Sequence, residues 1–139
     1  MKIALFSFLT TLAAPAGERV ILFRERPVFI NSGIEHSVSR EDYERVRSWE
    51  PKAGSAAPLT SAQAVSIARS ALAGKIDDHV LQAISLCEVN LYEKDIVKQL
   101  PVTGTRWFYL VSFTGKRPAP TRCVVTMSGV AASRRKFAD

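Results

Sequence analysis

Hydrophobic positions recur at helical spacing most clearly just after residue 59. The apolar side chains at this spacing are Ala64, Val65, Ile67, Ala68, Ala71 and Leu72. Thr60 and Gln63 stand three residues apart, which is the spacing of a capping box, and Gly74 supplies a left-handed stop. The pattern predicts a helix from Ser61 to about Ala73 that packs on a sheet and buries most of Ile67 and Leu72.

Three later segments, residues 81–92, 106–114 and 122–127, alternate between apolar and other side chains, as half-buried strands do. The apolar odd-numbered positions are Leu81, Ala83, Cys87, Val89 and Leu91, then Trp107, Tyr109, Val111 and Phe113, and then Cys123, Val125 and Met127. Phe108 and Leu110 are apolar as well, so the middle strand should be central and covered on both faces. We predict an α+β fold in which the helix packs on an antiparallel β-meander.

The residues before this unit are the available cover for the other face. Residues 20–30 read as an extended segment, and Pro27 restricts any strand there to a sheet edge. Ser39 can cap a short helix that runs through Arg47, and residues 52–58 read as a small-residue linker. A second copy of the chain, forming a homodimer through a sheet face, is the alternative cover.

The first residues have the order of a secretory signal peptide. Lys2 gives a basic start, residues 3–12 are mostly apolar, and Ala14-Pro15-Ala16 is a small-residue cleavage site. The alternative is a buried first strand. The apolar run is shorter than the roughly 20 residues of a membrane-spanning helix. We therefore expect no membrane span, export to the periplasm or beyond the cell, and three parts: a signal at 1–16, an extended segment with a short helix at 17–58, and an α+β domain at 59–139.

Composition agrees with a folded domain, because 47% of the 139 residues are hydrophobic and 23% are charged. The formal net charge is +6, with basic residues interleaved with acids and densest at residues 134–136. We interpret this tail as mostly solvated surface. Adhesion to an anionic envelope surface is the alternative.

Several motifs together resemble a known family: Ser39-Arg40-Glu41-Asp42-Tyr43, Trp49-Glu50-Pro51, Pro58-Leu59-Thr60, Trp107-Phe108-Tyr109-Leu110-Val111 and Val124-Val125-Thr126-Met127-Ser128-Gly129-Val130. Their order is similar to that in small exported bacterial proteins whose later part is PepSY-like, an arrangement loosely similar to the cystatin-like helix on a curled sheet. The resemblance implies a role in restraining a peptidase or a chaperone-like role, by analogy of fold alone. It carries no catalytic motif.

The chain contains no glycine-rich phosphate loop, nucleophile elbow or Cys-x-x-Cys pair. His36 and His79 lie in separate polar segments, so we interpret both as surface histidines and Asp77-Asp78 as part of a polar loop. A small hydrolase or metal-dependent enzyme that uses these histidines and nearby acids is one alternative function. A nucleic-acid binder that stacks bases on Trp107-Phe108-Tyr109 is another, disfavoured because Trp107 and Tyr109 share the core face.

We expect the two cysteines to be free, whereas a strand order with the first and third strands adjacent would allow a disulfide between them. In a simple meander, Cys87 and Cys123 lie on the outer strands, about 9.6 Å apart across two strand spacings, which exceeds the ~6.8 Å that a disulfide spans. Both would face the same apolar side. We predict a non-enzymatic exported binding module for an envelope protein or peptide, with no catalytic, cofactor-binding or metal-binding residues and no nucleic-acid partner.

Overall fold

The computed structural model describes residues 18–27, 32–90, 104–117 and 119–138. These residues form two antiparallel three-stranded sheets with a few helical segments, which confirms the predicted α+β class. The strand order is β1-β2-β6 in one sheet and β3-β4-β5 in the other. The elements are β1 (Arg19–Glu25), β2 (Ser32–Ser39), α1 (Arg40–Glu44), the 3-10 turn η1 (Pro51–Ala53), α2 (Ser61–Ala71), β3 (Val80–Glu88), β4 (Trp107–Thr114), β5 (Thr121–Thr126) and β6 (Ser133–Ala138).

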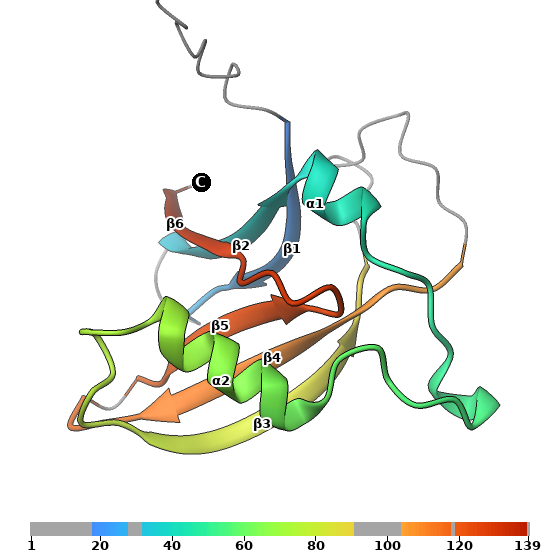
Figure 1. Ribbon diagram of the computed structural model, residues 1–139. Helices are drawn as coiled ribbons and strands as arrows, with labels where there is room; N and C mark the ends of the chain where they lie inside the picture. Colours follow the sequence, from blue (N-terminus) through green and yellow to red (C-terminus); the bar gives the residue numbers. More distant parts are fainter. Residues whose placement is uncertain (1–17, 28–31, 91–103, 118, 139) are drawn as a thin grey trace, which may run out of the picture.

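Helix α2 forms where the sequence predicts it and lies across one face of the β3-β4-β5 sheet (Figure 1). The capping box between Thr60 and Gln63 is complete, and Gly74 has a φ of 83°. Ala64 and Ala68 are fully buried beneath the helix, because their small side chains let it approach the sheet closely. Leu72 is buried as expected, whereas Ile67 is only partly buried.

The meander is also confirmed, with β4 central between β3 and β5. A register shift between Leu81 and Ala83, however, changes which side chains of β3 face the helix. Leu81 and Ile84 pack on the helix side, whereas Cys87 and Val89 pack on the opposite side. The predicted single apolar face of β3 is therefore wrong beyond the bulge, because one extra residue reverses every following side chain.

The opposite face of the β3-β4-β5 sheet is covered by the chain itself, by α1 and the β1-β2-β6 sheet (Figure 1). Val20 and Leu22 of β1 and Val38 of β2 pack there with Phe108 and Val124. The early segment thus provides the cover that we expected from it. Strand β1 is an edge strand, as Pro27 predicts.

Two strands of this second sheet were not predicted. Residues 32–39 form β2, and the basic tail forms β6, which pairs with β2 along its length. Arg135 and Lys136 are exposed, in agreement with the interpretation of the tail as mostly solvated surface, whereas Arg134 and Phe137 are partly buried. The short helix α1 is capped by Ser39, as predicted, because the Ser39 hydroxyl accepts a hydrogen bond from the amide of Asp42, but the helix ends at Glu44 rather than at Arg47.

The connection between α1 and α2 is fixed by side chains at the start of β4. Arg106 donates to the carbonyl oxygen of Val46 at 3.0 Å, and the Trp107 indole donates to that of Trp49 at 3.0 Å. The Tyr109 hydroxyl donates to the carbonyl oxygen of Leu59 at 2.7 Å. These bonds satisfy loop carbonyls and hold the segment against the end of the sheet.

The signal-peptide prediction concerns residues 1–16, which lie outside the described residues. Residues 28–30 of the predicted extended segment and residues 91–92 of the strand predicted over 81–92 also lie outside them. The division at residue 58 stays a prediction. Strand β6, from the far end of the chain, pairs with β2 from before this division.

Candidate binding pocket between the two sheets

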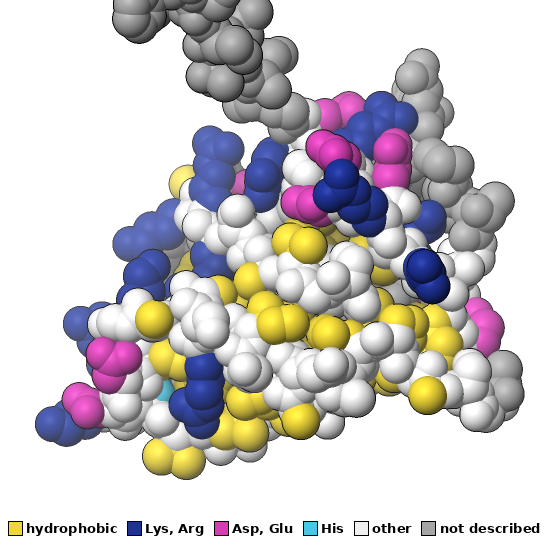
Figure 2. Space-filling view, in the orientation of Figure 1, with side chains coloured by type: hydrophobic (Ala, Val, Ile, Leu, Met, Phe, Trp, Pro, Cys, Tyr) yellow, Lys and Arg dark blue, Asp and Glu magenta, His cyan; other side chains and the backbone are white. Residues whose placement is uncertain are grey.

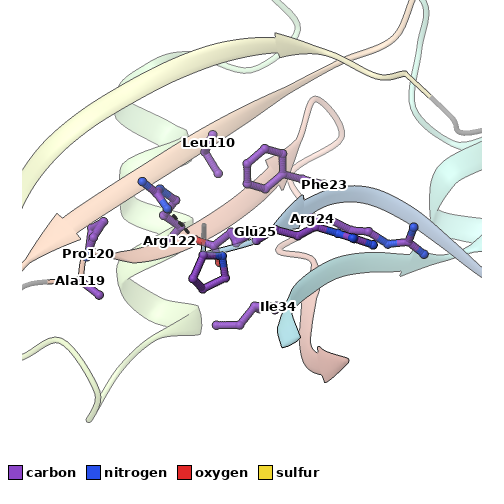
Figure 3. Close-up of a pocket in the computed structure, with 11 residues that line it drawn as sticks. Phe23, Arg24, Glu25, Ile34, Leu110, Ala119, Pro120 and Arg122 are labelled. Carbon is purple, nitrogen blue, oxygen red and sulfur yellow. Dashed lines mark hydrogen bonds and ion pairs between the residues drawn. The ribbon is translucent and has the colours of Figure 1, made fainter. Parts of the chain in front are cut away.

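A pocket of about 560 Å³ opens to solvent where the two sheets diverge, near the end of β1 (Figure 3). We call it the inter-sheet pocket. Strands β1 and β2 supply one wall, and β4 with the start of β5 supplies the other. Its lining residues are Phe23, Arg24, Glu25, Arg26, Pro27, Gly33, Ile34, Leu110, Ala119, Pro120 and Arg122.

The walls are apolar because strand alternation points Phe23, Ile34 and Leu110 inward from facing sheets. Leu110 is one of the two even-numbered apolar residues, with Phe108, from which the sequence predicted that β4 is covered on both faces. Gly33 allows β1 and β2 to approach closely here, since a β-carbon at this position would collide with the carbonyl oxygen of Glu25 and the ring of Phe137. The pocket therefore depends on a glycine at the start of β2.

An ion network joins the two sheets at the pocket. Arg122 of β5 donates to one carboxylate oxygen of Glu25 at 2.9 Å, and Nε2 of His36 lies 2.9 Å from the other (Figure 3 draws the Arg122 bond). The His36 side chain is fully buried, and the Glu25 side chain is 13% exposed. A buried carboxylate is tolerated because both of its oxygens have partners.

Burial by itself would raise the pKa of the Glu25 carboxyl. Hydrogen bonds from His36 and Arg122, with their positive charge, outweigh this and hold the pKa below its usual value. Because an ionised carboxylate only accepts hydrogen bonds, Nε2 of His36 carries the hydrogen when the ring is neutral. Nδ1 is then an acceptor, and it is buried without a hydrogen-bond partner among the described residues.

The interpretation of His36 as a surface residue is wrong. Ile34, His36 and Val38 alternate along β2, but two apolar residues around a histidine are too weak a signal to predict a strand. The carboxylate orients the His36 ring as it would in a general base, yet the nitrogen left for a substrate is buried, and His36 is not among the pocket-lining residues. This network is therefore suited to holding the sheets together.

His79 lies elsewhere, in the loop between α2 and β3, and it is partly exposed. Asp77 in this loop accepts a hydrogen bond from the amide of Gly74, as a polar turn would. The structure thus does not bring the two histidines into one site. Among the described residues, no group of three or more His, Cys, Asp or Glu side chains is placed to hold a metal ion.

The aromatic run of β4 does not form an open stacking platform. Tyr109 is buried on the helix side, Phe108 is buried on the opposite side, and Trp107 packs edge-on against Trp49 with ring centroids 6.4 Å apart. Alternation along β4 places Phe108 on the face opposite to Trp107 and Tyr109, which share the helix side as the sequence indicated.

Both cysteines are free, as predicted, because β4 separates β3 from β5. They do not share a face, however, since Cys87 packs on the side of β1 and Cys123 packs beneath α2. Burial raises the pKa of both thiols, that of Cys123 to about 11 even though the charge of Arg134 lowers it. Neither thiol is activated for chemistry.

Comparison of the chain with protein-family models, with curated proteins and with solved structures found no match. Within the described ranges, no helix has the length and apolar character needed to cross a membrane.

Proposed function

We propose that this protein is an exported, non-catalytic binding module that holds an apolar side chain of a peptide or protein segment in the inter-sheet pocket. The observation that carries the proposal is the pocket itself, which combines apolar walls with a rigid polar network. Its volume of about 560 Å³ lies in the range of ligand sites, roughly 300–1,000 Å³.

The chemistry of the lining favours binding over catalysis. Both carboxylate oxygens of Glu25 already have partners, Arg122 and His36, and the free nitrogen of His36 is buried, so no described group of the network is poised to accept a substrate proton. Phe23, Ile34 and Leu110 offer apolar contact area on two sides. An extended segment can cross the open mouth and insert one apolar side chain.

The resemblance to PepSY-like proteins agrees with this proposal by analogy, because a domain that restrains a peptidase acts by binding and performs no chemistry. Export rests on the signal-like residues 1–16. An envelope protein or peptide is therefore the partner class that we propose. A hydrolase or metal-dependent enzyme and a nucleic-acid binder remain the alternatives. Among the described residues no cluster is placed to hold a metal ion, and the aromatic side chains of β4 do not form a stacking platform.

The test is a peptide selection followed by a pocket variant. A phage-displayed library of random 12-residue peptides is selected on the purified protein, and affinities of selected peptides are measured by fluorescence polarisation. Ile34→Lys places a charged chain in the pocket, so affinity should fall at least tenfold. Leu86→Lys makes the same change in charge on β3, whose Leu86 is 39% exposed and does not line the pocket, and it should leave affinity within twofold.

Near-ultraviolet circular dichroism of both variants confirms that they fold. Selected peptides that bind Ile34→Lys as well as they bind the original protein would place the binding surface elsewhere. Failure to select any peptide that binds better than its scrambled form would also overturn the proposal.

A further inference from the structure

A second pocket, of about 510 Å³, lies at the end of the molecule where the loop after α2 meets the β4–β5 turn and β6. We call it the basic pocket. Figure 2 shows Lys and Arg side chains gathered along this side of the molecule. The residues that line it are Lys75, Asp78, His79, Lys116, Arg117, Thr121 and Arg134.

The charges of the basic pocket are strongly unbalanced. Lys75, Lys116, Arg117 and Arg134 are positive at neutral pH, and Asp78 is the one carboxylate among the lining residues. In the part of the chain that the structure describes, none of these four cations has a carboxylate within ion-pair distance. Elsewhere on the surface, Arg40 and Arg45 are paired with glutamates. The four cations repel one another, so a bound anion would stabilise their arrangement.

The fold holds the pocket walls in place. Arg134 stands opposite His36 in the β2–β6 register, and its Nε atom is buried. The ring of His79 lies directly over Gly115, where an added β-carbon would come within 2.6 Å of the ring. Thr121 begins β5 and adds a hydroxyl group. Donors thus converge from three segments that are far apart in sequence.

We propose that the basic pocket binds a phosphate group. A phosphate carries close to two negative charges at neutral pH and several acceptor oxygens, so it can accept from lysine, arginine and threonine donors on different walls at once. A single carboxylate has one charge and two oxygens. The volume also leaves room for whatever the phosphate is attached to.

The proposal does not depend on the inter-sheet pocket, which has different lining residues. The phosphate could belong to a free phosphorylated molecule or to a lipid headgroup. Inorganic pyrophosphate is the probe for the first source. Vesicles of phosphatidylcholine with and without about a third phosphatidic acid, an anionic lipid whose headgroup is a phosphate monoester, are the probe for the second.

The experiment measures pyrophosphate binding by calorimetry at low salt, with the amide resonances of His79, Thr121 and Arg134 followed by NMR. Lys116→Gln/Arg117→Gln removes two exposed cations from the pocket and should weaken binding at least tenfold. Arg135→Gln/Lys136→Gln removes the same charge from exposed positions of β6 outside the pocket, and it should weaken binding less than threefold.

Equal weakening by the two double variants would show general attraction to a basic surface and overturn the proposal. So would the absence of pyrophosphate binding at millimolar concentration, or resonance changes remote from the pocket. If pyrophosphate binds in the pocket and anionic vesicles do not, the source is a free phosphorylated molecule. If the vesicles also bind and Lys116→Gln/Arg117→Gln releases them selectively, a lipid headgroup is a source of the same ligand chemistry.

Discussion

On one face of the β3-β4-β5 sheet, α2 covers Val111, Phe113 and Cys123; on the other face, α1 and the β1-β2-β6 sheet cover Phe108, Leu110 and Val124. The helix side is closely packed with apolar side chains, and the small Ala64 and Ala68 bring α2 close to the sheet. The sheet side contains the buried His36–Glu25–Arg122 network and opens at one end into the inter-sheet pocket. Close apolar packing leaves no room for a ligand, whereas two sheets joined by a polar network can diverge and leave a pocket.

The largest effect should come from a charge placed beneath the helix. Ala68→Asp would bury a carboxylate where the present side chain is fully buried, and it should lower the free energy of unfolding by at least about 4 kcal/mol. Chemical denaturation provides the measurement. Ser66→Asp makes a comparable change on the exposed side of α2 and should stay within about 0.5 kcal/mol. Equal destabilisation by the two variants would mean that α2 does not seal this face.

Matched valine truncations compare the two faces directly. Val111 faces the helix and Val124 faces the β1-β2-β6 sheet, and both are fully buried. Replacing either by alanine removes two methyl groups and leaves a cavity, so each variant should lose about 2 kcal/mol in urea denaturation. A loss from Val124→Ala below about 0.5 kcal/mol would show that the second sheet does not form a true core.

The Glu25 network should make the sheet side sensitive to acid. The pKa of Glu25 is lowered on folding, so the ionised carboxylate stabilises the folded protein. This contribution to stability is fully present above the ordinary pKa of 4.5, and it is lost as the pH falls through the lower pKa of the folded protein. Glu25→Gln should lose about 1–2 kcal/mol at pH 7, with a shallower fall in stability below pH 4.5.

Denaturant unfolding at several pH values measures this difference. Glu44→Gln removes an exposed carboxylate from its pair with Arg40 and should change stability by no more than about 0.5 kcal/mol at any pH. If Glu25→Gln keeps the full acid dependence of the original protein, other carboxylates control it.

The smallest effect concerns reactivity rather than stability. Cys123 has a pKa of about 11, so only about one molecule in a thousand carries its thiolate at pH 8. Cys87, which is only partly buried, should react with a thiol reagent before Cys123 does in the native protein. Both should react in the denatured, unreduced protein. Faster labelling of Cys123 would contradict its burial beneath α2.

Much of the helix side could be predicted because its signals are local. The capping box at Thr60, the spacing of Ala64 and Ala68, and the alternation in β4 and β5 each depend on residues a few positions apart. Free cysteines followed from the strand order. The bulge in β3 was not predictable in this way, because an extra residue in a strand becomes visible only against its partner.

The sheet side and both pockets were decided by tertiary structure. Strand β2 has a polar sequence, and β6 is a basic tail that becomes a strand only because β2 is beside it. Glu25, His36 and Arg122 are separated by up to 97 positions, so no local pattern reveals their network. The sequence by itself determined which segments have an apolar face, since periodicity is a property of neighbouring residues. The tertiary structure decided which polar groups meet, because that depends on chain segments brought together from a distance.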